Sequence, residues 1–591
     1  MSHRADPPER APDASSTPPW VLREYAVIAD GERGAVLDPE GRIVWLCAPR
    51  WHDDAVFSSL IGGPGHFTVR PADPWHVWGG YYEEGSLIRV SRWVTSGWLV
   101  ECREALAMPA STDRLVLLRR MRAVRGEPRL RLTLDARPGF GTGRMRDPRR
   151  QDGVWSAGAE GLRMRLLGAP DAVWRPEEGL TGEFRLREGE SHDLVLELSV
   201  TPRAEPLDAD ALWRATEREW QRAVPDCSRL IAPRDARHAY AVLRGLTSVS
   251  GGMVAAATTS LPERANSGRN YDYRFAWLRD QCYAGLAVAA HGPHPLLDDA
   301  VRFAAERLLQ DGDGLHPAYT VDGDRVGAAR SLRLPGYPGG TDHVGNDAGA
   351  QFQLDTFGEA LQLFAAAAAH DRLTEDAERA AAVAVDAVAR QWQRPDAGLW
   401  ELEERWWTHS RLSVVCGLRR MADVLPGSAG RRCGDLADTV LRETRRRCLR
   451  PDGRWSRAAD DDGPEAALLV PIARGCATDD DGAATREYIE SRLTEDGYLY
   501  RFEHPDKPLG EPEGAFLLCG FTMALAAHRL DDRLGAFRWF ERTRAACGPS
   551  GLFAEEYDVR RRQLRGNLPQ AFVHAAMLES AVRLAGVATV P

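Results

Sequence analysis

The sequence predicts a protein of two domains, an N-terminal antiparallel β-sandwich followed by an (α/α)6 barrel of six helical hairpins. Three observations predict this fold class. The chain has 591 residues, which is too long for one ordinary hydrophobic core. Short apolar runs separated by turn residues fill residues 20–205, whereas residues 234–591 carry the apolar spacing of helices. We therefore expect a tail at 1–19, the sandwich at 20–205, a linker helix region at 206–233 and the barrel at 234–591.

The tail and the sandwich differ in their apolar residues. Residues 1–19 are rich in Pro, Ser, Asp and Arg and lack the apolar stretch of a signal peptide, so we expect a disordered tail. Beyond the tail, apolar and polar residues alternate, as they do in strands that bury only one face. The clearest alternations are at Leu130, Leu132 and Leu134, and at Leu194, Leu196 and Leu198.

Helical spacing begins at residues 208–224, where Trp213, Trp220 and Val224 fall on one face of the expected linker helix. Twelve further helices complete the chain. We expect them at 234–248, 277–291, 296–309, 350–369, 375–393, 408–423, 428–448, 464–472, 482–493, 513–529, 533–546 and 569–586.

The twelve helices alternate in character, which predicts how they pack. Residues 515–527 are apolar almost all round, as in a helix buried on every side, whereas the next helix at 532–546 has one charged face. Six such hairpins close into a barrel with the even-numbered helices inside. The even helices then run parallel, so the polar segments that precede them meet at one mouth. Those segments include 277–280, 344–347, 400–401, 460–462, 513 and 555–558.

Composition excludes several classes of partner. Lys and Arg number 76 against 86 Asp and Glu, a net charge of −10 without a basic run, so nucleic acid is not expected. No apolar stretch is long enough to span a membrane. The ten cysteines are scattered without a CxxC pair, and we expect reduced core thiols in a cytoplasmic protein. No metal or cofactor motif is present, so we expect neither.

The stretch from Asn270 to Asp280 mixes aromatic rings, arginines and carboxylates at the approach to a helix. Buried charges are costly unless they are paired, so a hydrophobic core has no use for this mixture. A sugar site does use it, because rings stack on pyranose faces while Arg and carboxylate groups bind hydroxyls. The stretch indicates a carbohydrate pocket.

Two downstream carboxylates suit acetal hydrolysis, which needs an acid on one face of the sugar and a base or nucleophile on the other. Glu401 follows Trp400, and an aromatic neighbour that excludes water raises a carboxyl pKa toward the acid role. An N-cap role does not fit Glu401, which lies about seven residues before its helix. Glu555 stands in a loop beside Glu556, for which we expect a structural use.

Other residues near these motifs allow two interpretations each. Glu513 is either a helix-start charge favoured by the helix dipole or a substrate ligand. Trp406 and Trp407 either form a wall for a sugar or pack the rim of the barrel.

Several motifs in order resemble glycoside hydrolase family 15, the glucoamylase family, in its bacterial two-domain form. The resemblance covers almost the whole chain after the tail. It rests on 25–30, 43–47, 257–263, 269–280, 344–346 with 353–355, 399–401, 513–519, 555–558 and 566–572.

This resemblance implies an N-terminal β supersandwich, an (α/α)6 catalytic barrel and anomer-inverting removal of a terminal glucose. By position, Glu401 resembles the general acid and Glu555 the general base. The expected substrate-binding residues are Trp277, Arg279, Asp280, Trp400, Arg501, Glu513 and Tyr557, with Arg279 and Asp280 holding the terminal glucose. Tyr271, where Trp is common, and Leu402, where some members have a second carboxylate, depart from the family and leave the leaving-group specificity open.

The sequence therefore predicts an inverting exo-α-glucosidase that acts on short isomalto- or malto-oligosaccharides. A trehalase of the same family is the nearest alternative. An inverting disaccharide phosphorylase, in which phosphate replaces base and water, or a non-catalytic carbohydrate sensor would use the same scaffold. The presence of Glu555 argues against the phosphorylase, and the Glu401/Glu555 pair argues against the sensor. Inversion predicts that the two carboxyl groups lie roughly 6.5–9.5 Å apart.

Overall fold

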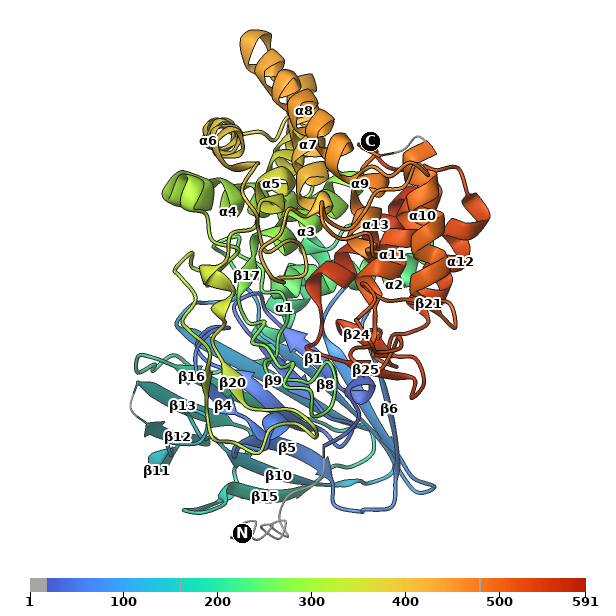
Figure 1. Cartoon of the computed structure of the whole chain (residues 1–591). Helices are drawn as coiled ribbons and strands as arrows, with labels where there is room; N and C mark the ends of the chain where they lie inside the picture. Colours follow the sequence, from blue (N-terminus) through green and yellow to red (C-terminus); the bar gives the residue numbers. More distant parts are fainter. Residues whose placement is uncertain (1–18, 160, 478–479, 591) are drawn as a thin grey trace, which may run out of the picture.

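The computed structural model describes residues 19–159, 161–477 and 480–590, which form a β domain below a helical domain (Figure 1). The tail expected at 1–19 lies outside these residues except for Pro19. Both expected fold classes are confirmed, and the β elements give way to helices between Ser199 and Ala209.

The β domain consists, within the described residues, of two eight-stranded antiparallel sheets. One has the order β1-β2-β3-β5-β10-β15-β14 with β4 paired to β3, and the other the order β11-β12-β13-β16-β9-β8-β7-β6. The predicted alternations are confirmed, because Leu130, Leu132 and Leu134 on β10 are buried in the core between the sheets. The strands are β1 (Ala26–Ala29), β2 (Gly34–Leu37), β3 (Arg42–Cys47), β4 (Ala55–Phe57), β5 (His66–Pro71), β6 (Val77–Tyr82), β7 (Arg89–Val94), β8 (Leu99–Leu106), β9 (Arg114–Arg125), β10 (Arg129–Asp135), β11 (Arg146–Gln151), β12 (Val154–Ala159), β13 (Leu162–Leu167), β14 (Val173–Arg175), β15 (Gly179–Arg185) and β16 (Ser191–Ser199).

A helix lies between the last strand of the β domain and the first helix of the barrel. Helix α1 (Ala209–Ala223) begins at Asp208, whose carboxylate accepts a hydrogen bond from the amide of Ala211. Trp213 and Trp220 on its inner face are buried in the core that extends into the barrel.

Over its described residues, the helical domain has a closed inner ring of six helices with six further helices outside it. All twelve expected helices are present in the described residues. The inner helices are α3 (Leu278–His291), α5 (Asp355–Ala368), α7 (Thr408–Val424), α9 (Leu469–Ala473), α11 (Leu517–Arg529) and α13 (Ala571–Leu584). Each packs against the next, and α13 packs back against α3, so the ring closes. The outer helices are α2 (Pro233–Leu246), α4 (Pro295–Asp311), α6 (Glu375–Gln391), α8 (Gly427–Cys448), α10 (Asp480–Leu493) and α12 (Arg533–Arg544).

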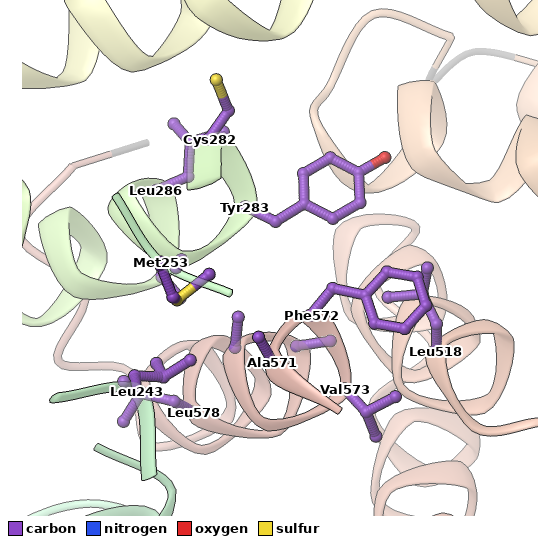
Figure 2. Packing of buried hydrophobic residues seen from close by; sticks show 14 of the residues in the cluster. Leu243, Met253, Cys282, Tyr283, Leu286, Leu518, Ala571, Phe572, Val573 and Leu578 are labelled. Atoms are coloured by element: carbon purple, nitrogen blue, oxygen red, sulfur yellow. The ribbon is translucent and has the colours of Figure 1, made fainter. Parts of the chain in front are cut away.

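Apolar side chains fill the spaces between these helices. Leu243 on the outer helix α2 lies beside Leu578 of α13, while Leu286 of α3 and Leu518 of α11 approach from neighbouring helices (Figure 2). The prediction that helices at even positions are buried all round is confirmed for α3, where every residue except His291 is buried, whereas α7 exposes Arg419 and Asp423 near its end.

Some predicted helices begin later than expected, because the chain at the barrel mouth is extended. Residues 513–516 are not helical, and Ala515–Phe516 (β23) pairs instead with Glu556–Asp558 (β24). Helix α5 begins at Asp355 after a short 3-10 turn, Asp347–Ala350, and not at 350. The other short strands are β17 (Ala276–Trp277), β18 (Ala318–Tyr319), β19 (Arg330–Ser331), β20 (His343–Val344), β21 (Thr494–Glu495), β22 (Tyr498–Leu499) and β25 (Gln563–Arg565), and the remaining 3-10 turns are Leu22–Glu24, Ser59–Ile61, Gly312–Gly314 and Ala466–Leu468.

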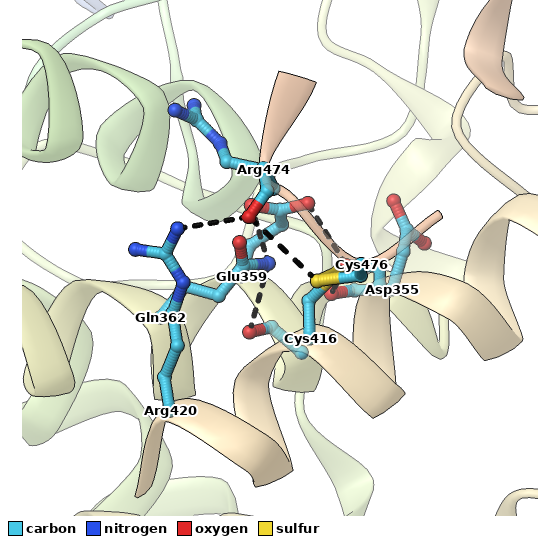
Figure 3. Close-up of a disulfide and its surroundings, with 9 residues drawn as sticks. Asp355, Glu359, Gln362, Cys416, Arg420, Arg474 and Cys476 are labelled. Atoms are coloured by element: carbon cyan, nitrogen blue, oxygen red, sulfur yellow. Dashed lines mark hydrogen bonds between the residues drawn. A yellow bond between two sulfur atoms is a disulfide. The ribbon is translucent and has the colours of Figure 1, made fainter. Parts of the chain in front are cut away.

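The expectation that all cysteines are reduced is wrong for one pair. Cys416 on α7 is disulfide-bonded to Cys476, which follows α9, with their Cα atoms 5.5 Å apart (Figure 3). The 60-residue separation gives no local motif, so only the packing of the two segments reveals the bond. The other eight cysteines are free. No helix in the described ranges is long and apolar enough to cross a membrane.

Candidate active site

A cavity of 380 Å³ opens at the mouth of the barrel, where the inner helices begin. Its walls come from the segments before α3, α5, α7, α11 and α13, and four of the six expected segments, 277–280, 344–347, 400–401 and 555–558, contribute to it. Before α11 the lining residues are Arg501 and Phe516 and not the expected Glu513. The aspartates at 460–462 do not line the cavity either and pair with arginines such as Arg450 and Arg457. The segment before α9 acts on the cavity only through Glu465, which accepts a hydrogen bond from the cavity residue Trp400.

Glu401 projects into the cavity from a tight turn after Gly398. The backbone of Glu401 is left-handed, with φ of 58°, an uncommon conformation for a residue other than glycine. One carboxylate oxygen accepts a hydrogen bond of 2.7 Å from the indole N–H of Trp277. The guanidinium of Arg279 lies 3.5 Å from the same oxygen. The carboxylate is thus held by two donors from the start of α3.

Trp400 lines the cavity but turns its polar edge away from Glu401. Its indole N–H donates a hydrogen bond to Glu465, and its ring packs against Phe516. The indole that contacts Glu401 therefore belongs to Trp277, whereas the sequence suggested Trp400.

Glu555 lies deeper in the cavity, from the segment before α13. One carboxylate oxygen accepts a hydrogen bond of 3.0 Å from the hydroxyl of Tyr273. The other has no hydrogen-bond partner among the described residues. Burial, and next the charge of Glu263, raise the pKa of Glu555 well above its usual value, although Arg501 opposes this shift. Glu555 therefore has one oxygen held by Tyr273 and a second that is buried without a hydrogen-bond partner among the described residues.

Gly566 supports this carboxylate from behind. Its φ of +79° is in the left-handed region, and a Cβ atom there would lie 3.2 Å from an oxygen of Glu555. A larger residue would push the carboxylate forward, so glycine is required at this position.

Glu556 points elsewhere, as expected of two adjacent carboxylates on an extended segment. Its side chain accepts a hydrogen bond of 2.7 Å from the amide of Gly514, which joins β24 to the segment before α11. It does not line the cavity.

Arg279 and Asp280 both line the cavity at the start of α3. Their side chains form an ion pair of 3.3 Å, and Arg279 also donates a hydrogen bond of 2.9 Å to the carbonyl of Leu399. Burial raises the pKa of Asp280 to about 6. The positive charge of Arg279 opposes this shift, and the negative charge of Glu401 adds to it. The pair is both an intramolecular ion pair and a wall of the cavity.

Arg501 lines the cavity and is fixed by Glu513, which does not. The two side chains form two hydrogen bonds, of 3.2 and 2.5 Å, and Arg269 lies 3.4 Å from Glu513. Burial opposes the charge of Glu513, but Arg501 and His504 outweigh it and lower the pKa to about 2. Glu513 is therefore neither a helix-start charge nor a cavity residue, since α11 begins only at Leu517.

Three aromatic residues singled out by the sequence lie outside the cavity lining. Tyr557 packs against Tyr498, with ring centroids 4.7 Å apart. Trp406 is buried beneath Arg411 and Arg447, and the indole of Trp407 donates to the carbonyl of Glu403. In this structure both tryptophans pack the rim.

Several cavity residues were not predicted individually. Tyr273, Glu263 and Arg269 come from the segment before α3, and Asn346 and Gln570 from the segments before α5 and α13. The aromatic composition of 270–280 was the signal for Tyr273. Nothing in the sequence pattern distinguished Glu263. No group of three or more His, Cys, Asp or Glu among the described residues is arranged to hold a metal ion.

A barrel mouth that presents two carboxylates from separate loops, beside polar and aromatic side chains, defines a glycoside hydrolase. The family model of glycosyl hydrolases family 15 matches residues 237–582. A second model, described as trehalase-like, N-terminal, matches residues 16–204. The chain belongs to glycoside hydrolase family 15.

Known proteins are similar over nearly the whole chain. A trehalase of Mycobacterium tuberculosis is 30% identical over 95% of this chain and 89% of its own length. Trehalase 1 of Sulfolobus acidocaldarius is 28% identical over 96% of this chain and 100% of its own length. The crystal structure of a bacterial glucoamylase complexed with acarbose superposes with a TM-score of 0.66 at 12% identity, covering 97% of this chain and 96% of that one. This last likeness concerns the fold alone.

Proposed function

We propose that this glycoside hydrolase is an inverting α,α-trehalase, with Glu401 as general acid and Glu555 as general base. The sequence alone placed isomalto- and malto-oligosaccharides first and trehalose second. The two sequence relatives named above favour trehalose instead, because both are named trehalases and both are similar over nearly the whole chain. The trehalase-like N-terminal match supports the same choice.

In the proposed reaction, Glu401 donates a proton to the oxygen that joins the two glucose units, and the bond from that oxygen to the anomeric carbon breaks. Glu555 accepts a proton from a water molecule, whose oxygen attacks the same carbon from the opposite face. Arg279 and Asp280 would bind hydroxyls of the glucose unit that undergoes attack. Arg501 would contact the same unit from the other side of the cavity.

One observation carries the proposal. The two carboxylates enter one cavity from loops that lie far apart in the sequence, and each is oriented by an aromatic donor, Trp277 for Glu401 and Tyr273 for Glu555. The cavity volume of 380 Å³ suits a short substrate, since it lies near the lower end of the roughly 300–1,000 Å³ typical of ligand pockets.

The test is to incubate the purified protein with trehalose, maltose, isomaltose and soluble starch and to measure glucose release. We expect trehalose to be hydrolysed with the highest kcat/KM, with or without added phosphate. A preference for maltose or isomaltose would restore the alternative substrate, and an absolute need for phosphate with formation of a sugar phosphate would indicate a phosphorylase.

A further inference from the structure

The segment that carries Tyr273 has two faces with different uses. Tyr271 and Tyr273 lie on the cavity side, with their rings nearly parallel and 6.2 Å apart. Asp272 and Arg274, at the alternate positions, are buried on the opposite side. Successive side chains of an extended chain point in opposite directions, so this alternation follows from the backbone. Hydrogen bonds from the amides of Ser260 and Ala256 hold the segment extended.

The two buried residues form a bidentate ion pair. The guanidinium of Arg274 donates hydrogen bonds of 2.9 and 2.7 Å to the two carboxylate oxygens of Asp272. Fork-to-fork pairing of this kind fixes orientation as well as charge. We call Asp272 and Arg274 the interdomain pair, because each side chain also contacts another part of the fold.

Arg274 contacts the β domain. Its remaining nitrogen lies 2.8 Å from the carbonyl oxygen of Asp53, 3.3 Å from that of Trp51 and 3.2 Å from the sulfur of Cys47. These three acceptors belong to β3 and the turn that follows it. The β domain thus provides three hydrogen-bond acceptors for one arginine of the barrel, from Cys47, Trp51 and Asp53.

Asp272 contacts the cavity wall that precedes α5. Its carboxylate accepts a hydrogen bond of 3.0 Å from the amide of Gly345, and its carbonyl accepts one of 3.2 Å from the side chain of Asn346. Both residues line the cavity. Gly345 has φ of +83°, and a Cβ atom there would lie 2.4 Å from the carbonyl oxygen of Ala328, so only glycine fits.

The same wall rests on the β domain at a second place. The amide of Gly336 donates to the carbonyl of Ile61 at 3.0 Å, and the hydroxyl of Tyr337 donates to the carbonyl of Trp20 at 2.7 Å. The chain from 330 to 344 accordingly lies along the β domain (Figure 1). One wall of the cavity is therefore supported from outside the barrel.

We propose that the interdomain pair is a positioning device through which the β domain holds Tyr273 against Glu555 and holds the cavity wall at Gly345 and Asn346. The β domain then takes part in catalysis without touching substrate. This inference rests on the proposed role of Glu555 as the base, but not on the identity of the sugar.

The proposal has a consequence for the pH dependence of the rate. The hydrogen bond from Tyr273 favours the ionised form of Glu555, so loosening Tyr273 raises the pKa of the base further. The acid limb of the pH profile of kcat/KM then moves to higher pH. The other charged groups that act on Glu555 are Glu263 and Arg269 from the segment before α3 and Arg501 from the segment before α11.

The experiment compares two variants of the pair with a matched control in the full chain. Arg274→Lys keeps a positive charge but loses the fork, and Asp272→Asn keeps the shape of the side chain but loses its charge. The control is Arg119→Lys. Arg119 is equally buried and also pairs with a carboxylate, Glu104, and with two carbonyls, those of Gly41 and Phe67, yet all its partners lie within the β domain.

We expect all three variants to lower Tm. Arg274→Lys and Asp272→Asn should also lower kcat by at least about tenfold per folded molecule and move the acid limb to higher pH, whereas Arg119→Lys should keep both. If the variants of the pair lose stability but retain kcat and the wild-type acid limb, the pair is structural only and the proposal is wrong. Asp272→Asn, which preserves volume, decides the question should Arg274→Lys not fold.

These measurements use whichever α-glucoside the wild type hydrolyses best. Failure of trehalose as a substrate would contradict the proposed function while leaving the comparison between variants intact. An unchanged acid limb with good trehalose turnover would contradict the positioning role alone.

Discussion

Tyr273 and Trp277 pack edge to face, with ring centroids 5.5 Å apart, and each donates a hydrogen bond to one of the two carboxylates of the cavity. Tyr273 contacts Glu555, and Trp277 contacts Glu401. Two residues four apart in one short segment therefore set the relation between the proposed acid and the proposed base, although the two glutamates themselves are far apart in the sequence.

Replacing the carboxyl group of either Glu401 or Glu555 should abolish most activity without unfolding the protein. We expect Glu401→Gln and Glu555→Gln each to lower kcat by about 10²–10⁴-fold, the usual worth of general acid or base assistance. Glu403→Gln is the control, because Glu403 lies two residues from Glu401 but is exposed and pairs with Arg405. Steady-state kinetics on trehalose would show this, and near wild-type turnover in either glutamine variant would remove that residue from its role.

The products should carry the signature of inversion. Trehalose joins two glucose units through two α-anomeric carbons, so inversion at one of them releases equal amounts of β- and α-glucose at first. A retaining enzyme would release α-glucose alone. Proton NMR before mutarotation distinguishes these outcomes. A crystal structure should place the carboxyl groups of Glu401 and Glu555 roughly 6.5–9.5 Å apart, and a separation near 5–5.5 Å would contradict the mechanism.

Asp280 should matter for binding more than for stability. If its carboxylate holds glucose hydroxyls, Asp280→Ala leaves buried donors unpaired in the transition state, at about 1–3 kcal/mol for each lost hydrogen bond. We expect kcat/KM to fall accordingly. Thermal unfolding of the same preparation is the second measurement. A purely structural ion pair with Arg279 predicts the opposite result, a lower Tm with activity per folded molecule preserved.

The acid limb of the pH profile should respond to Glu263. The negative charge of Glu263 is the second cause, after burial, of the raised pKa of Glu555. Glu263→Gln removes that charge and leaves Arg269, its partner at 2.7 Å, to favour the ionised base. The pKa of Glu555 should fall, so the base stays ionised at lower pH and the acid limb of kcat/KM moves to lower pH. An unchanged limb would mean that a different group sets it.

Asp355 should make stability depend on pH. It is buried with neither carboxylate oxygen hydrogen-bonded within the described structure, and burial, followed by the charge of Asp396, raises its pKa to about 7. A raised carboxyl pKa means that the native state binds more protons than the unfolded state between about pH 4 and 7, so this group's contribution to stability is lost as pH rises through that window. Asp355→Asn should raise the free energy of unfolding at pH 8 by up to about 4 kcal/mol. Denaturant unfolding at pH 4 and pH 8 tests this, and an equal effect at both values would contradict the assignment.

The sequence predicted the fold well because the apolar periodicity of the helices and that of the strands are both strong. Helices such as α11 are apolar on every side, and the leucines of β10 alternate cleanly, so element type and order followed directly. The boundaries at 513–516 were wrong because a helical apolar pattern continues into residues whose backbone pairs with β24. That pairing joins segments far apart in the chain, and local spacing cannot reveal it.

The candidate site was predicted in outline and not in its contacts. Glu401 and Glu555 stood out by their motifs, and both line the cavity. The orientation of Trp400 toward Glu465 and the support of Arg501 by Glu513 depend on side-chain directions at the mouth. Tyr557 lies on the same segment as Glu555 but packs against Tyr498 outside the cavity, a contact with a distant segment that local spacing does not reveal. Neighbouring residues of an extended chain face opposite ways, which separates Glu555 from Glu556.

The closed ring of inner helices also sets when the enzyme can first work during its synthesis. Helix α13 packs against both α3 and α11, and the segment that carries Glu555 comes just before it. A ribosome makes this part after α3, α11 and α12, so a nascent chain that has reached α12 presents uncovered apolar sides of α3 and α11 and lacks its proposed proton acceptor. We therefore expect such chains to be inert toward sugar and to be bound by chaperones until α13 emerges.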